Sequence, residues 1–211
     1  MSAKARKALA ATDPTMAELI DRVGKIDLPT RLARRSEERP PDAYGALLRA
    51  IVGQQLSTKA ARTIYLRVLD VFDGQTPSPE QLLGASEADL RGAGLSGRKV
   101  EYIRDLATHV IEGELELDRL DELGDEEAIG EIVAVRGLGR WTAEMFLMFH
   151  LQRADVLSGG DLGIRKAVQI EYGLEEMPSP EAVLKIGERW RPHRSLASLY
   201  LWESLAAVPG V

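Results

Sequence analysis

Two glycines and one carboxylate mark the places in this sequence whose residue types and spacing could do chemistry. The run Val135-Arg136-Gly137-Leu138-Gly139 forms a turn between two predicted helices, and Asp161 follows 22 residues after Gly139. Glycine permits positive φ and brings no side chain, so the amides that begin the next helix can point at an anion such as phosphate. A plain glycine-capped connection between helices would have the same sequence, and an Asp before a helix is also an ordinary N-cap.

Helical periodicity predicts the elements that must position these residues. Apolar side chains recur at i, i+3, i+4 and i+7 over residues 44–51, 61–68 and 103–110. Helix starts are predicted where a cap residue precedes a proline or acidic first turn, at Ser78, Ser86 and Ser179, and Ser96 opens a further helix after the Gly92 and Gly94 stop signals. Residues 126–133 are predicted helical, 141–149 form a helix buried on nearly all sides, and Pro192 divides the last stretch into two helices. The sequence predicts an all-α protein of about ten helices.

Composition excludes several classes of chemistry. The 211 residues contain no cysteine, which rules out disulfides, a cysteine nucleophile and an iron–sulfur cluster held by thiolates. No apolar run approaches the length of a membrane-spanning helix, and the basic N-terminus, with no apolar stretch after it, indicates a short frayed tail rather than a secretory signal. We expect a soluble, cytoplasmic protein with no membrane partner.

The net charge of −6 conceals an uneven distribution. Residues 112–131 carry ten acids against one base, Arg119, which leaves +3 for the rest of the chain. A solvated acidic face is the ordinary explanation of such a run. The remaining surface can therefore be locally basic and can bind a polyanion.

Four motifs, in order along the chain, together resemble a known enzyme family. The tract from Val135 to Phe149 followed by Asp161 resembles the helix-hairpin-helix and Gly/Pro-rich loop with aspartate (HhH-GPD) of base-excision DNA glycosylases. Within that superfamily the chain resembles the 3-methyladenine DNA glycosylase II family, which removes alkylated bases. The matching segments are Ile51–Ser57, Gly139–Ala143, Gly160–Gly163 and Glu188–Pro192 with Arg194-Ser195, and the resemblance covers roughly residues 42–206.

Departures from the superfamily pattern indicate which branch of the superfamily the chain resembles. Bifunctional members carry a lysine nucleophile two positions after the second hairpin glycine, where this chain has Trp141, so we expect a monofunctional enzyme. The missing cysteines disfavour the branches that hold an iron–sulfur cluster. About 40 residues precede Pro41, too few for the β-rich N-terminal domain of some alkylation-repair members. The chain resembles the compact form.

The resemblance implies two lobes, with the helix-hairpin-helix motif in one and an active-site cleft between them. We expect residues 1–40 to form an N-terminal tail and a helical arm, about residues 15–35, that packs on the C-terminal lobe. Residues 41–153 would form the lobe with the wedge loop and hairpin, and residues 154–211 the C-terminal lobe with the catalytic Asp loop.

The resemblance also assigns roles to individual residues. Asp161 would be the catalytic carboxylate, which stabilises the oxocarbenium-like sugar and orients the attacking water. Leu56 or Gln55 would be the wedge that fills the gap left by the extruded base, unless Leu56 is simply buried in its lobe. The expected substrate pocket consists of Trp141, Trp202, Met145 and Tyr44, although both tryptophans could instead be core residues. The expected contacts to the DNA backbone are Gly137, Gly139, Arg140, Arg98 and Lys99.

The expected partner is double-stranded DNA containing damaged bases, bound by a monomer in a bacterial-type cytoplasm, close to the nucleoid. No cofactor is expected to be required and no iron–sulfur cluster to be present, although a structural sodium or potassium ion is implied at the hairpin carbonyls of Val133, Val135 and Gly137. Three alternatives remain open: a non-catalytic helix-hairpin-helix DNA-binding module, a glycosylase of the same superfamily acting on mismatched, deaminated or oxidised bases, and a helical protein without a DNA role.

Overall fold

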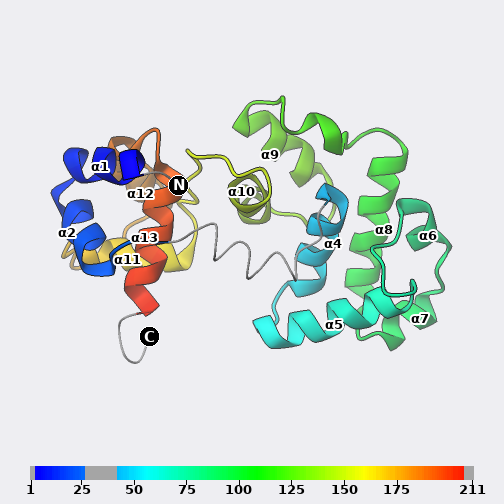
Figure 1. Cartoon of the computed structure of the whole chain (residues 1–211). Helices are drawn as coiled ribbons and strands as arrows, with labels where there is room; N and C mark the ends of the chain where they lie inside the picture. The colour runs from blue at the N-terminus through cyan, green and yellow to red at the C-terminus, as the bar shows by residue number, and fades with distance from the viewer. Residues whose placement is uncertain (1–2, 27–41, 207–211) are drawn as a thin grey trace. The chain divides into compact units, whose positions relative to one another are not determined.

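Only helices form the regular structure in the described part of the chain, residues 3–26 and 42–206 of the computed structural model (Figure 1). Twelve α-helices and two short 3-10 helices lie there, and the described residues contain no strand. The all-α prediction is confirmed. None of the described helices is long and apolar enough to cross a membrane.

Contacts divide the chain into two units, each with its own buried residues. One unit joins the two ends of the chain, Met1–Arg35 and Leu147–Val211, and the other consists of Ser36–Phe146. The boundaries expected from the sequence were residues 40 and 153, whereas the second boundary between the units lies inside helix α10 (Arg140–Phe149). This helix is largely buried, as its apolar sequence predicts. The cleft expected between two lobes stays a prediction.

Helices from both ends of the sequence build the first unit. They are α1 (Ala3–Thr12), α2 (Pro14–Val23), α11 (Leu162–Glu171), α12 (Pro180–Gly187), the 3-10 helix η2 (Glu188–Trp190) and α13 (Arg194–Ala206). Helix α13 packs against both α2 and α11 (Figure 1). Trp190, Tyr200 and Met16 are fully buried in their common core, and Leu9 of α1 lies beside them.

A buried carboxylate ties the N-terminal helices to this core. Asp13 is 1% exposed and caps α2 by accepting from the backbone N–H of Met16. Its Oδ2 accepts from the Tyr172 hydroxyl at 2.5 Å and from Trp190 Nε1 at 2.9 Å. A buried charge is stable only when it is hydrogen-bonded in this way, so Asp13 fixes where the first two helices pack.

The prediction of a frayed N-terminal tail is wrong, and the predicted arm is described only over its first part. Residues 3–12 form helix α1 rather than a frayed tail, because Ala5 and Leu9, one turn apart, pack into the core. The arm helix α2 ends at Val23, since Gly24 adopts a φ of 75° that stops the helix. Residues 27–41, with the Pro40-Pro41 break and the rest of the predicted arm, lie outside the described residues.

The second unit contains the remaining helices, α4 (Ala43–Gly53), α5 (Thr58–Asp70), α6 (Pro79–Gly84), α7 (Glu87–Gly92), α8 (Gly97–Ile111), η1 (Leu117–Arg119) and α9 (Asp125–Ala134). Helix α8 is its centre and packs against α4, α6 and α7. The predicted caps are confirmed here, since the side chains of Ser78, Ser86 and Ser96 each accept from a backbone N–H in the first turn. Ser179 caps α12 in the other unit in the same way.

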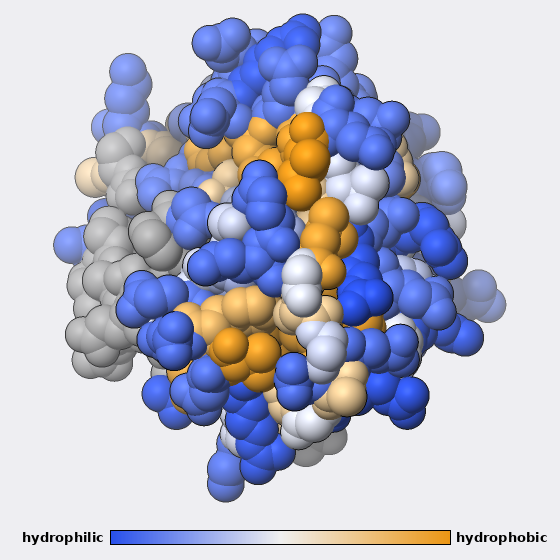
Figure 2. Space-filling model, turned by 90° about the vertical axis from the view of Figure 1, so that its right-hand side faces the viewer, coloured by the Kyte–Doolittle hydropathy of each residue, from blue (hydrophilic) through white to orange (hydrophobic). Residues whose placement is uncertain are grey.

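The surface of the second unit is mainly polar. Figure 2 shows the side of the molecule on which α6, α7 and α8 lie in Figure 1, where hydrophilic residues surround strips of hydrophobic ones. Leu66, Val71 and Ile111 are among the exposed apolar residues of this unit. In the acidic segment, residues 112–131, Leu115 and Leu120 are buried while eight of the ten acids are exposed. The predicted solvated acidic face is confirmed.

Candidate active site

Asp161 stands at the N-terminus of α11 with one carboxylate oxygen held by two donors. Its Oδ1 accepts from the backbone N–H of Ile164 at 2.8 Å and from the indole Nε1–H of Trp202 at 2.9 Å. The N-cap prediction is confirmed. Two N–H donors and the positive end of the helix dipole therefore converge on this oxygen and hold the carboxylate in place.

Trp202 is fixed from two directions. Its indole stacks on Phe149, with ring centroids 6.0 Å apart and an interplanar angle of 27°, while its N–H meets Asp161. The residue that permits this contact is Gly163, because a Cβ there would lie 3.1 Å from both Asp161 Oδ1 and Trp202 Cδ1. Gly163 was not predicted as a site residue, although its position two residues after Asp161 in the sequence could have indicated one.

The hairpin turn between α9 and α10 needs glycine at one of its two glycine positions. Gly137 has a φ of 87°, and a Cβ on it would overlap the ring of Tyr102. Around a Cβ built at Gly139, by contrast, no atom of the described residues lies within 4 Å. Gly137 therefore shapes the turn, whereas Gly139 keeps the surface clear in front of the first amides of α10.

Arg140 begins α10 but its guanidinium is occupied. It makes a two-pronged ion pair with Glu126 at 2.6 and 2.9 Å, and its Nε donates to Glu144 at 2.9 Å. The Glu126 carboxylate raises the pKa of Arg140 further above its usual value. Any contact of this residue with a phosphate is therefore expected through its backbone amide.

The predicted pocket residues of the second unit differ strongly in exposure. Trp141 is 53% exposed, so it is not a core tryptophan. Met145 is half-buried, while Tyr44 is 7% exposed and its hydroxyl has no hydrogen-bond partner among the described residues. Burial, with smaller contributions from Glu80 and Asp42, raises the pKa of Tyr44 well above its usual value. Trp141 is thus a surface residue, whereas Tyr44 has the surroundings of a core residue.

The loop expected to carry the wedge follows α4. Gln55 is exposed with a φ of 58°, and Leu56 is 36% exposed, so the alternative that Leu56 is buried is wrong. Ser57 ends the loop by capping α5 through the N–H of Ala60. Both side chains can reach a partner outside the protein.

Arg98 and Lys99 begin α8, but only one of them points at solvent. Arg98 is exposed. The Lys99 ammonium is partly buried and donates to the carbonyls of Val52 at 2.7 Å and Gln54 at 2.9 Å. Burial lowers the pKa of Lys99. Of the two, Arg98 is the better placed for a phosphate.

Backbone carbonyls are the implied ligands of a monovalent cation at the hairpin. Val135 O accepts from the N–H of Leu138 at 3.1 Å, and Gly137 O accepts from Gln54 Nε2 at 2.6 Å. A carbonyl oxygen has two lone pairs, so each can take a further ligand, and Val133 lies in the last turn of α9. The donor set fits a hard cation, which would stiffen the turn, and its binding stays a prediction.

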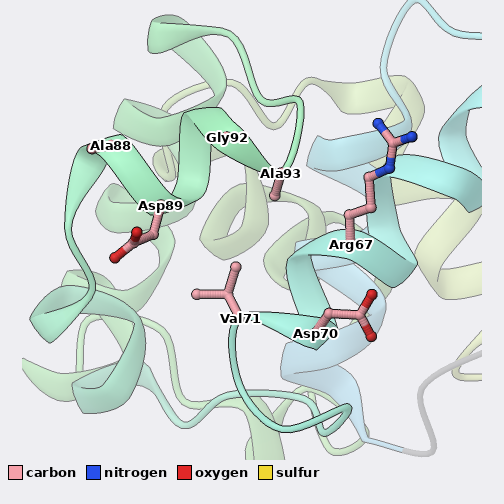
Figure 3. Close-up of a pocket in the computed structure, with 7 residues that line it drawn as sticks. All are labelled: Arg67, Asp70, Val71, Ala88, Asp89, Gly92 and Ala93. Atoms are coloured by element: carbon pink, nitrogen blue, oxygen red, sulfur yellow. The ribbon is translucent and has the colours of Figure 1, made fainter.

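The second unit also has two surface hollows. One, of about 580 Å³, lies between α5 and α7, lined by Arg67, Asp70, Val71, Ala88, Asp89, Gly92 and Ala93 (Figure 3). The other, of about 340 Å³, lies along the first half of α5 and is lined by Ser57, Lys59, Ala60, Thr63 and Ile64. Neither includes Asp161, Trp141 or Trp202 in its lining.

Comparison with known proteins defines the class that this fold and these motifs represent. The sequence model of one protein family, described as HhH-GPD superfamily base excision DNA repair protein, matches residues 48–192. The chain belongs to this superfamily.

Individual relatives cover nearly the whole chain. DNA-3-methyladenine glycosylase 1 of Schizosaccharomyces pombe is 34% identical over 203 residues, which span 95% of this chain and 86% of that protein. Among solved structures, a DNA-3-methyladenine glycosidase from Bacillus halodurans superposes with a TM-score of 0.84 at 37% identity, covering 95% of this chain and 88% of that one. The S. pombe 3-methyladenine DNA glycosylase in complex with abasic DNA superposes with a TM-score of 0.81 at 31% identity, covering 97% and 98%.

Proposed function

We propose that the protein is a DNA glycosylase that hydrolyses the N-glycosidic bond of alkylated purines, of the 3-methyladenine type, in duplex DNA. The observation that carries the proposal is the Asp161 carboxylate, held at the start of α11 by Ile164 and Trp202, in a chain of the HhH-GPD superfamily. Relatives named for 3-methyladenine support the substrate class. The proposed setting is base excision repair by a monomer in the compartment that holds the DNA.

The chemistry asked of this chain is modest, because alkylation at N3 or N7 already makes the base a good leaving group. Asp161 stabilises the positive charge that develops on the sugar and takes the proton from the attacking water. An indole face, such as that of the exposed Trp141, favours a cationic alkylated base over a neutral one by cation–π attraction. Protonation of the base by an acid of the protein is not needed.

DNA binding falls to the second unit. The amides that begin α10, cleared by Gly139, and the guanidinium of Arg98 bind phosphates, and Gln55 or Leu56 enters the stack when the damaged nucleotide rotates out. Extrusion costs a few kcal/mol, which these contacts supply.

The substrate class is tested with synthetic duplexes that each carry one defined lesion: 3-methyladenine, 7-methylguanine, hypoxanthine or ethenoadenine. We expect release of the charged bases, 3-methyladenine and 7-methylguanine, to be fastest, since the indole faces favour cations. Free base is quantified by chromatography, with undamaged duplex as control. Release confined to a neutral or mismatched base would assign the protein to another branch of the superfamily, and binding without any release would make it a non-catalytic module.

The reaction is expected to leave an intact abasic site. A lyase needs an amine that forms an imine with the sugar, and at the corresponding hairpin position this chain has the indole of Trp141, which cannot. Lys166, five residues beyond Asp161, lies more than a helical turn further along α11, and its ammonium donates to Gln169 at 3.3 Å.

Borohydride treatment of enzyme and alkylated duplex should therefore trap no covalent complex, and strands should break only after alkali or heat. A bifunctional glycosylase with a hairpin lysine is the positive control. A trapped adduct on this protein would refute the monofunctional assignment.

A further inference from the structure

The loop that carries Gln55 and Leu56 is hydrogen-bonded both to the start of α8 and to the hairpin turn, the two segments proposed to bind the DNA backbone. Lys99, next to Arg98 at the start of α8, donates to the carbonyls of Val52 and Gln54. The side chain of Gln54 in turn donates to the carbonyl of Gly137 in the hairpin, at 2.6 Å. Three segments far apart in sequence thus meet at one short loop.

The chemistry of these contacts explains why a lysine lies there. Val52 and Gln54 are at the C-terminal end of α4, where carbonyls lack helical N–H partners and carry partial negative charge. An ammonium with three donors satisfies two such carbonyls at once, which a neutral residue of the same length cannot do.

Backbone strain in the loop gives a second, independent observation. Gln55 has a φ of 58°, a left-handed conformation that non-glycine residues rarely adopt and that persists only where the surroundings enforce it. Gln54, directly before it, is bound through both its carbonyl and its side chain, and Ser57, two residues later, caps α5. The loop is thereby fixed on both sides of the strained residue.

We propose that Lys99 and Gln54 are positioning residues for base extrusion, which hold the wedge loop rigidly against the two phosphate-binding turns. The inference rests on the proposed function and adds that the wedge loop must be held in place for the base to stay extruded. A wedge can keep an extruded base from restacking only if it cannot move away from the residues that grip the backbone. Lys99 therefore acts through the loop rather than on a phosphate.

The test compares Lys99→Met, which keeps the apolar stem, with Lys99→Arg, which keeps the donors. Single-turnover base release from a paired lesion, at saturating enzyme, should fall about tenfold or more for Lys99→Met and stay within about threefold for Lys99→Arg. Gln54→Leu should resemble Lys99→Met. Lys185→Met, an exposed lysine on α12 with the same charge change, should match the wild type.

A second substrate separates loop positioning from general damage to the fold. When the lesion lies in a bulge, it is already unstacked and extrusion is easier. The defect of Lys99→Met should then shrink to about threefold or less. An equal loss on both substrates, or no loss on the paired one, would overturn the inference.

Wedge insertion can also be followed without base release. A 2-aminopurine placed next to an abasic analogue becomes brighter when it is unstacked, so its emission on saturating binding should rise less with Lys99→Met than with wild type. Arg98→Met should instead weaken binding to all duplexes and reduce the salt slope by about one. Equal emission from Lys99→Met and wild type would refute the positioning role even if no base were released, whereas absent base release by the wild type would refute only the proposed function.

Discussion

Asp161→Asn is expected to slow base release by at least about a hundredfold, the effect of removing a preorganised charge from a transition state. Asparagine keeps an oxygen that can accept from Ile164 and Trp202, so the start of α11 should be preserved while the negative charge is lost. Single-turnover rates on an alkylated duplex measure the effect, and affinity for abasic DNA should change little. Near-normal release by the variant would remove Asp161 from the mechanism.

A matched variant shows whether Trp202 acts through this carboxylate. Trp202→Phe loses the N–H donor but keeps an aromatic ring against Phe149. We expect a smaller loss, about tenfold, as for one hydrogen bond to a charged group. In the Asp161→Asn background the same change should cost much less, since the two residues would act as a unit.

Alanine at each of the two hairpin glycines is expected to have a different effect on DNA affinity and thermal stability. Gly139→Ala should leave thermal stability unchanged, because its Cβ enters open space, yet lower affinity for every duplex about tenfold by obstructing the phosphate. Gly137→Ala should lower affinity and also the melting temperature by at least about 5 °C, since it combines a left-handed φ with overlap on Tyr102.

Calorimetry and fluorescence anisotropy on the same samples separate the two effects. Gly130→Ala, in the exposed middle of α9, is the control and should be neutral or slightly stabilising. Full affinity in Gly139→Ala would show that no phosphate approaches this turn.

Local signals predicted most of the helices because each depends on a few neighbouring residues. The serine caps and the apolar repeats of α4, α5 and α8 needed only chain-local rules, and the helix start at Asp161 was found in the same way. Leu9 was missed because the short helix α1 is stabilised by packing on α2, η2 and α13, and contacts with other elements cannot be detected from periodicity within α1.

The site was predicted less completely, for the same reason. Lys99 looked like a phosphate ligand because a basic residue after a glycine turn is typical of one, and only the fold brings the end of α4 within its reach. The role of Gly163 follows from its contact with Trp202, 39 residues later in the chain, and the sequence alone does not indicate that contact. Contacts between distant segments decide which basic or small residue faces the ligand.

The division of the chain into one unbroken unit and one assembled from both ends has a consequence for synthesis on the ribosome. Helices α1 and α2 are made well before Tyr172 and Trp190, the hydrogen-bond partners of Asp13, which follow it by more than 150 residues. At roughly 5–20 residues per second this delay is on the order of ten seconds. During that time the unit formed by residues 36–146 can complete its own contacts. Until the later residues are made, α1 and α2 remain a separate amphipathic segment whose apolar side chains are exposed to chaperones.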